Sequence, residues 1–268
     1  MERINLDSVI RVPANHTSKG DQPKWEVNGK WYKADHLGYE SLSEVLVSRL
    51  LEHSNAGNFV RYDPVEIEIG RQIMNGCVSE NFRAKSEALI PLERLHRAFI
   101  GRGLAAELAK MGDVVERIKY TVDFVEAQTG LTGFGQYLTL LLELDAFSLN
   151  EDRHTNNIAV ITDEDTGEFR LCPIFDNGLA LLADTNDYPL NEDVYDCIDR
   201  VKAKPFSRDF NEQAEAAVSL YGSQLRFDFD RPYVENMILE LDNQFPPDTL
   251  SRGRDVLLEQ MRRYSVLF

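Results

Sequence analysis

The pattern of hydrophobic and polar positions changes character near residue 92 of the 268-residue chain. Before that point, short runs rich in β-branched and aromatic residues are separated by polar turns, which is typical of a small sheet. Asn28 and Gly29 stand between two such runs and form the preferred two-residue turn of a hairpin. Residues 87–95 resemble a strand that leaves this sheet. The other strand-forming stretches are expected at residues 7–14, 25–35, 59–69 and 76–82.

Helical spacing occurs once in this first part and repeatedly after it. Leu42, Leu46 and Leu50 recur every fourth residue, which predicts a helix over residues 40–53. Beyond residue 92, apolar residues recur at helical spacing over most of the chain. The clearest helices are expected at residues 114–129 and 134–150, and a strand, a turn and a second strand at residues 157–162, 163–167 and 168–175.

These elements predict an α+β protein with two lobes. The first lobe, residues 1–92, would be a small antiparallel sheet with one helix. The second lobe, residues 93–268, would be larger and mainly helical, with one internal hairpin. A chain of this length can bury a core in each lobe.

Charge and cysteine content narrow the class of protein. The formal net charge is −16, which repels phosphate backbones, so no direct binding of nucleic acid is expected. Cys77, Cys172 and Cys197 are odd in number and far apart, which favours a reducing, cytoplasmic setting. The first 20 residues lack the apolar stretch of a signal peptide, and no run of 18 apolar residues occurs, so no insertion into a membrane is expected.

A polar cluster, EDRHTNN, stands directly before the predicted hairpin of the second lobe. Asp152 precedes Asn157 by five residues, and the hairpin ends in FDNG, which contains Asp176. Because a hairpin returns the chain to its start, Asn157 and Asp176 should be neighbours. Amide and carboxylate oxygens are the ligands that Mg²⁺ prefers, and Asp152 could orient an acceptor hydroxyl and take its proton. The protein-kinase catalytic loop has the same Asp-to-Asn spacing. One interpretation of the cluster is a loop of turn-forming residues, with Asp176 capping a strand end. Taken with the hairpin and FDNG, the cluster favours phosphoryl transfer, with Asn157 and Asp176 as metal ligands.

Phosphoryl transfer from ATP also requires a cation on the nucleotide phosphates. Lys33 lies on a strand-like run, and Glu44 follows eleven residues later on the predicted helix. A strand lysine paired with a helix glutamate is the arrangement that fixes the lysine on the phosphates. Lys30 and Lys24 are alternatives for the lysine, and Glu40 for the acid.

A polar turn upstream of Lys33 could cover the phosphates. In TSKGDQPK, Gly20 permits close backbone approach, and Ser18 and Lys19 add hydrogen-bond donors. The turn has one glycine, so it is neither a Walker loop nor a GxGxxG motif.

With these residues in place, the chain resembles the HipA-like kinases, a branch of the protein-kinase-like fold. The signature is D-x-H-x-x-N at Asp152, His154 and Asn157, and DRHTNN also matches the D-R-H-x-x-N form of the phosphatidylinositol kinases. QPK after a short turn is similar to the HipA-like N-lobe. SEVLVSRLLEHSN is similar to that family's Asn-Glu helix with Ser43 in place of the asparagine, which favours Glu44 over Glu40.

The resemblance implies a role for each candidate residue. Asp152 would be the catalytic base, Asn157 and Asp176 would hold Mg²⁺, and Lys33 would contact ATP. His154 would support the loop. A hinge at residues 87–92 would pack against the adenine through Leu89, Ile90 and Pro91. Regulation by phosphorylation of a loop serine, here Ser18, would repel the nucleotide phosphates.

The acceptor stays open. A HipA-like serine/threonine protein kinase is the main hypothesis. The alternatives are a small-molecule or phosphoinositide-type kinase, and a nucleotide-binding pseudokinase that acts through protein interactions. A metal-dependent hydrolase would need more closely spaced ligands than the chain offers. A basic run at Arg200, Lys202, Lys204 and Arg208 is either a solvated loop or a site for a phosphate, an acidic peptide or an anionic head group.

Overall fold

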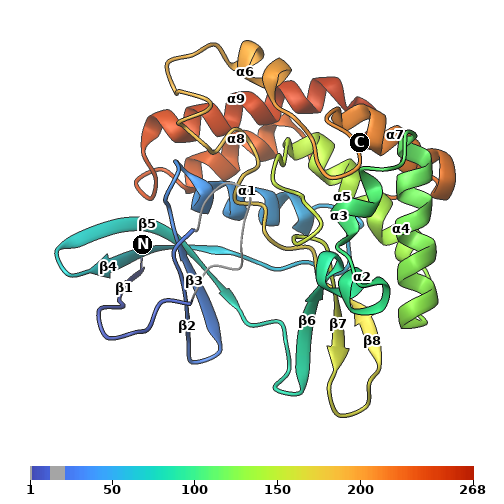
Figure 1. Ribbon diagram of the computed structural model, residues 1–268. Coiled ribbons are helices and arrows are strands. Elements are labelled where there is room, and N and C mark those ends of the chain that lie inside the picture. The colour runs from blue at the N-terminus through green and yellow to red at the C-terminus, as the bar shows by residue number, and fades with distance from the viewer. Residues whose placement is uncertain (1, 13–21) are drawn as a thin grey trace.

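The computed structural model describes residues 2–12 and 22–268, and its N-terminal part is built on a five-stranded sheet (Figure 1). The strand order is β1-β4-β5-β3-β2. The strands are β1 (Glu2–Asn5), β2 (Lys24–Val27), β3 (Lys30–Ala34), β4 (Asp63–Ile69) and β5 (Gln72–Glu80). The pairs among β2, β3, β4 and β5 are antiparallel, as predicted, and only the edge strand β1 runs parallel to its neighbour β4, which makes the sheet mixed.

The expected hairpin is confirmed, and the expected first strand is wrong. Asn28 and Gly29 have φ values of 52° and 79°, the left-handed conformations that a type I′ turn requires. The strand was expected at residues 7–14, of which the structure describes residues 7–12. These residues form no strand, and the edge strand of the sheet is β1, which lies earlier in the chain. Leu6 and Val9 reach the sheet core through a turn closed by the Val9 N–H on the Leu6 carbonyl at 3.0 Å.

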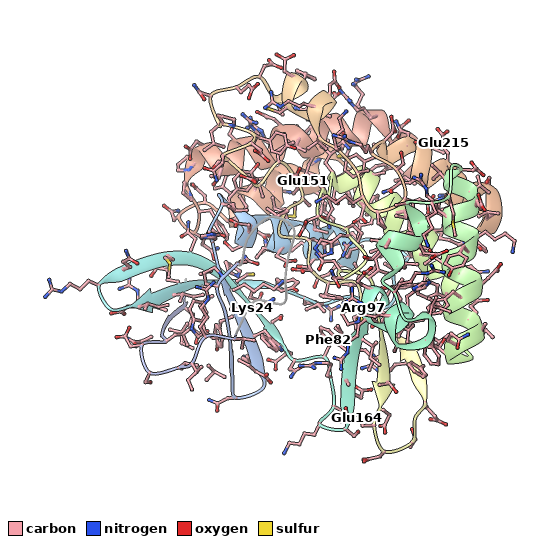
Figure 2. The ribbon with its side chains drawn as sticks, viewed as in Figure 1. Lys24, Phe82, Arg97, Glu151, Glu164 and Glu215 are labelled. Atoms are coloured by element: carbon pink, nitrogen blue, oxygen red, sulfur yellow. The ribbon has the colours of Figure 1, made fainter. Side chains whose placement is uncertain are left out.

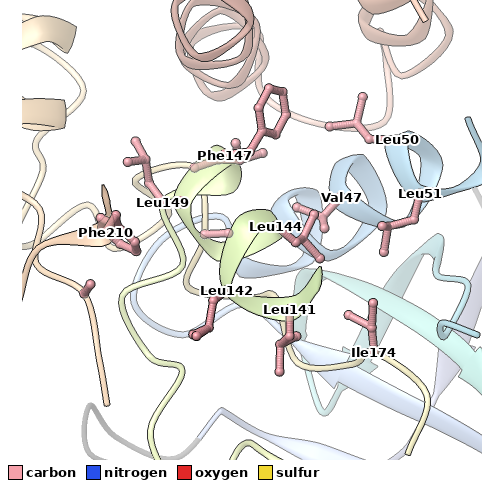
Figure 3. Close-up of a cluster of buried hydrophobic side chains, with 14 of the residues drawn as sticks. Val47, Leu50, Leu51, Leu141, Leu142, Leu144, Phe147, Leu149, Ile174 and Phe210 are labelled. Atoms are coloured by element: carbon pink, nitrogen blue, oxygen red, sulfur yellow. The ribbon is translucent and has the colours of Figure 1, made fainter. Parts of the chain in front are cut away.

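Helix α1 (Glu40–Glu52) confirms the helix expected over 40–53 and joins two parts of the molecule. Eleven of its residues are buried. Its apolar side chains belong to the main hydrophobic core, together with those of the C-terminal helices, whereas the sheet has a separate small core. Figure 3 shows Val47 and Leu51 of α1 in one cluster with Leu144 and Phe147 of α5. The helix therefore packs on the helical part of the protein as well as on the sheet.

A second sheet of three strands connects the two parts. Its order is β6-β7-β8, with β6 (Glu87–Pro91), β7 (Ala159–Asp163) and β8 (Phe169–Leu171), all antiparallel. The segment expected to leave the first sheet does so as β6 and pairs with β7. The expected hairpin is confirmed as β7 and β8, and Asp163 Oδ1 closes its turn by accepting from the N–H groups of Asp165 and Thr166.

The remainder is helical, as the spacing predicted. The helices are α2 (Leu92–Ile100), α3 (Leu104–Leu108), α4 (Val114–Thr129), α5 (Phe134–Ser148), α6 (Val194–Arg200), α7 (Phe210–Tyr221), α8 (Arg231–Glu240) and α9 (Pro247–Arg263), followed by a 3₁₀ turn at Ser265–Leu267. α4 has the expected bounds, and α5 ends two residues early because Leu149 turns left-handed, with φ 58°. Figure 1 shows α8 and α9 on the side of α1 away from the five-stranded sheet, and α2 near β6 of the second sheet.

The cysteines and the apolar character of the helices can now be placed in this fold. Cys77, Cys172 and Cys197 are all buried as free thiols. Among the described residues, no helix combines the length and the apolar character that crossing a bilayer requires.

Candidate active site

The polar cluster forms a compact loop between α5 and β7. Asp152 and Asn157 are buried, with 8% and 7% of their surface exposed. The Asn157 side-chain amide donates to the Asp152 carbonyl at 2.9 Å, and the Asn157 backbone N–H donates to the His154 carbonyl at 2.8 Å. Asn150 Oδ1 accepts from the Asp152 N–H at 3.2 Å. These bonds hold the Asp152 carboxylate and the side-chain amide oxygen of Asn157 in defined directions.

Arg153 organises this loop from inside the protein. Its side chain is 1% exposed and binds Asp145 of α5, which is fully buried, through Nε at 3.0 Å. The same guanidinium donates to the carbonyls of Asn157 at 3.2 Å and Phe175 at 2.8 Å, and to Asn177 Oδ1 at 2.7 Å. One cation thus ties α5, the loop that carries Asp152 and Asn157, and the segment after β8 together. Neither Arg153 nor Asp145 was among the predicted site residues, although an acidic residue inside the apolar run LLLELDAF was an available signal.

Asp176 follows β8 and stands beside this loop. Its φ is 61°, a left-handed conformation that is uncommon for a residue other than glycine and often marks functional sites. Asn150 Nδ2 donates to its carbonyl at 3.3 Å. Because Arg153 binds the carbonyls of Asn157 and of Phe175, the residue before Asp176, the hairpin brings the two loop ends together.

Lys33 reaches Asp176 from the sheet. Its ammonium lies 2.5 Å from Glu44 Oε1 and 2.9 Å from Asp176 Oδ1, and its side chain is 10% exposed. The three candidates come from β3, α1 and the segment after β8, and the fold brings them to one point.

The alternatives to Lys33 and Glu44 have other partners or positions. Lys30 is exposed and pairs with Glu80 at 3.2 Å. Lys24 faces Lys33 across the β2–β3 pair and is half-buried. Glu40 accepts from the backbone N–H groups of residues 36–38 just before α1, so it stabilises the turn into the helix.

Helix α1 is also bonded directly to the Asp176 segment. Glu44 Oε2 accepts from the Asn177 N–H at 2.9 Å. Ser43 Oγ donates to the carbonyls of Asn177 at 2.7 Å and Ala180 at 3.0 Å. Ser43 therefore joins α1 to the segment that carries Asp176.

Charges within this group determine its protonation. Burial alone would lower the pKa of Lys33, but the Asp176 and Glu44 carboxylates outweigh burial and hold that pKa well above its ordinary value. Burial would raise the pKa of Asp176, but the positive charges of Lys33 and Lys24 hold it well below its usual range. At neutral pH the site therefore presents a charged ammonium and a charged carboxylate.

His154 makes its hydrogen bonds within the loop. Its Nδ1 accepts from the Asn156 N–H at 3.2 Å, and its backbone N–H donates to the Asp152 carbonyl at 2.8 Å. Its Nε2 lies 3.7 Å from Asp152 Oδ2.

The predicted hinge residues lie in the second sheet. Leu89 packs on the small cluster of Ala159, Ile161 and Cys172, and Ile90 packs on the main core. Pro91 ends β6 opposite Ala159. Their contact with adenine stays a prediction, as does the domain boundary near residue 92. Ser18, Lys19 and Gly20 lie outside the described residues.

A basic side chain from a distant loop also reaches the catalytic loop. Lys204 Nζ lies 3.4 Å from Asp152 Oδ1.

An acidic cluster lies at the start of the same loop. Figure 2 labels Glu151, the first residue of this cluster, and Lys24, on the sheet. Glu151, Asp184 and Asp187 place their carboxylates within 4.8 Å of one another near that loop start.

The fold is protein-kinase-like, and within it Lys33 of β3, Glu44 of α1 and Asp176 meet at one point. Among solved structures, the chain is similar to the crystal structure of a Helicobacter pylori proinflammatory kinase, CtkA, with a TM-score of 0.63. That match covers 97% of this chain and 94% of the other at 15% identity, so it concerns the fold. No protein-family model and no curated protein matches the sequence. The predicted two-lobed kinase-like fold is confirmed.

Proposed function

We propose that this protein is an ATP- and Mg²⁺-dependent phosphotransferase, and that its acceptor is a serine or threonine hydroxyl of a protein. The observation that carries the proposal is the position of the Lys33 ammonium, 2.5 Å from Glu44 and 2.9 Å from Asp176. An isolated buried lysine would lose charge, whereas this one is held charged where nucleotide phosphates would meet a metal ligand.

The donor set suits Mg²⁺. Asp176 offers a carboxylate oxygen, Oδ2, beside the one that Lys33 binds, and Asn157 offers its amide oxygen because its NH₂ group is bonded to the Asp152 carbonyl. Both are hard oxygen ligands, and phosphates and water would complete the coordination. When bound there, Mg²⁺ would neutralise charge on the transferring phosphate.

The protein's own residues supply the remaining functions. Lys33 binds the phosphates and Glu44 keeps its ammonium in place. Asp152 accepts a hydrogen bond from the acceptor hydroxyl and takes its proton as the oxygen attacks the γ-phosphorus. Arg153 keeps Asn157 and the Asp176 segment in register by binding carbonyls on both.

Incubation with γ-labelled ATP and Mg²⁺ tests this function. Asp176→Ala and Asp152→Ala should each reduce autophosphorylation and ATP turnover at least a hundredfold. Asp165→Asn, at the exposed turn of the same hairpin, is the matched control and should behave like the wild type. A wild type without turnover, or an Asp176→Ala variant as active as the wild type, would refute the proposal.

Acceptor class can be resolved with the same assay. Label found on serine or threonine after acid hydrolysis supports a protein kinase. Label found only on added lipids or metabolites would assign the small-molecule class instead. ATP binding in a thermal-shift assay without transfer to any acceptor would indicate a pseudokinase.

A further inference from the structure

Among the four cations of the run at residues 200–208, Lys204 takes a distinct position. Arg200 pairs with Glu192 at 2.5 Å and stacks over the Tyr188 ring at 5.5 Å. Lys202 and Arg208 are exposed. Lys204 points inward, and its ammonium lies 3.4 Å from Asp152 Oδ1 with 36% of the side chain exposed.

The backbone on both sides of Lys204 is anchored. Val201, Ala203 and Phe206 are buried, so residues on both sides of Lys204 hold the segment against the helical core. Arg117 donates to the Phe206 carbonyl at 2.6 Å, and the Ala203 N–H donates to the Arg208 carbonyl at 3.0 Å. The segment therefore holds the Lys204 side chain in reach of Asp152.

The two oxygens of Asp152 face different groups. Oδ1 lies near Lys204, and Oδ2 lies 3.4 Å from the Asn157 amide. An acceptor hydroxyl bonded to this carboxylate would sit about 2.7 Å from it. The attacked phosphorus would lie about 3–3.5 Å farther on. A flexible lysine with three donors, already beside Oδ1, can reach the oxygens of that phosphoryl group.

The charge changes during transfer favour such a contact. The acceptor oxygen forms a bond to the γ-phosphorus, and its proton passes to Asp152. The bond from that phosphorus to the bridging oxygen breaks, and its electron pair stays on ADP. Asp152 becomes neutral when it takes the proton, so the attraction between Lys204 and Asp152 falls as the charged phosphoryl group arrives. Lys204 itself neither gains nor loses a proton.

We infer that Lys204 is a further catalytic residue, which contacts the transferred phosphoryl group on the acceptor side while Lys33 holds the nucleotide side. This rests on the proposed function. Lys204 lies on a loop 52 residues after the catalytic aspartate, Asp152. The catalytic loop has no lysine of its own, because positions 152–157 read DRHTNN, so we assign this role to Lys204.

Lys204→Met, Lys204→Arg and the control Lys202→Met separate this role from a structural one. We expect Lys204→Met to lower kcat for ATP turnover about a hundredfold, as loss of one transition-state donor does elsewhere. KM for ATP should stay within twofold of the wild-type value, and the melting temperature should stay within about 2 °C of it. Lys204→Arg should have a kcat at least tenfold higher than that of Lys204→Met, and Lys202→Met should match the wild type.

A binding measurement gives a readout that does not depend on turnover. Calorimetry with Mg²⁺ and ADP should give equal affinities for wild type and Lys204→Met. Added aluminium fluoride, which mimics the phosphoryl group in transfer, should raise the affinity of the wild type for ADP. The factor of this increase should be at least tenfold smaller in Lys204→Met.

Three outcomes would overturn the inference. Unchanged kcat in Lys204→Met would leave the proposed function intact and remove Lys204 from the chemistry. If Lys204→Met lost both ADP affinity and thermal stability, Lys204 would be a structural residue. A wild type without phosphoryl transfer would overturn the inference and the proposed function together.

Discussion

The buried pair of Arg153 and Asp145 allows a quantitative prediction. Replacing Asp145 by Leu leaves the Arg153 guanidinium, 1% exposed, without its counter-ion. Breaking a buried pair by removing one partner costs about 3–5 kcal/mol. That is a large share of the roughly 5–15 kcal/mol by which a domain is stable. We therefore expect Asp145→Leu to lower the free energy of unfolding by about 4 kcal/mol.

The double variant Asp145→Leu/Arg153→Met should lose less than the two single losses combined. It buries no unpaired charge, and its main cost is the three acceptors that lose Arg153, at roughly 1 kcal/mol each. Urea unfolding followed by circular dichroism at pH 7 gives the four free energies of the cycle. The exposed pair of Arg49 and Glu240 is the matched control, and breaking it should cost less than about 1 kcal/mol.

Activity adds a second criterion to this cycle. The double variant should remain strongly impaired in ATP turnover although it folds, because Asn157 and Asn177 have lost the donor that positions them. Strictly additive losses of stability would refute the charge-burial reasoning. Full activity in the double variant would refute the organising role of Arg153.

Three further predictions concern other parts of the molecule. Lys24→Met should raise KM for ATP several-fold in steady-state assays without changing stability, because Lys24 lies opposite Lys33 and its charge acts on Asp176, whereas Lys30→Met should have no effect. The hydrogen bond from Arg170 lowers the pKa of Glu87 to about 2, so its contribution to stability is present above pH 4.5 and is lost as pH falls toward 2. Glu87→Gln should therefore flatten the acid side of a melting-temperature profile, and Glu164→Gln, an exposed control, should leave that profile unchanged. Gly38→Ala would drive a Cβ into the Ala183 carbonyl and should cost about 1–3 kcal/mol in urea unfolding, whereas Gly57→Ala, with open space around it, should be nearly neutral.

Features that are local in the sequence could be predicted from it. The Asn28-Gly29 turn, α4 and the β7–β8 hairpin each depend on spacing within a few residues, and the structure has all three. The pairing of Lys33 with Glu44 could be proposed because strand and helix follow one another directly.

Contacts between distant segments could not be predicted in this way. The parallel pairing of β1 with β4 joins residues 63 apart and has no local pattern. Lys204 meets Asp152 only because buried neighbours direct its segment inward. The burial of Arg153 could not be predicted either, because an arginine is rarely enclosed unless it is paired, and its partner Asp145 lies on another element.

The attachment of α1 has a consequence for motion between the lobes. Ser43 and Tyr39 donate to carbonyls in the segment after Asp176, and the apolar side chains of α1 share the main core of the helical lobe. The five-stranded sheet keeps a core of its own. A rocking of the sheet would therefore shear along the face of α1 and would stretch both bonds of Lys33, to Glu44 and to Asp176. Swinging α1 outward would require breaking the interior of the larger lobe, so the sheet is the part that can tilt with the smaller loss of packing.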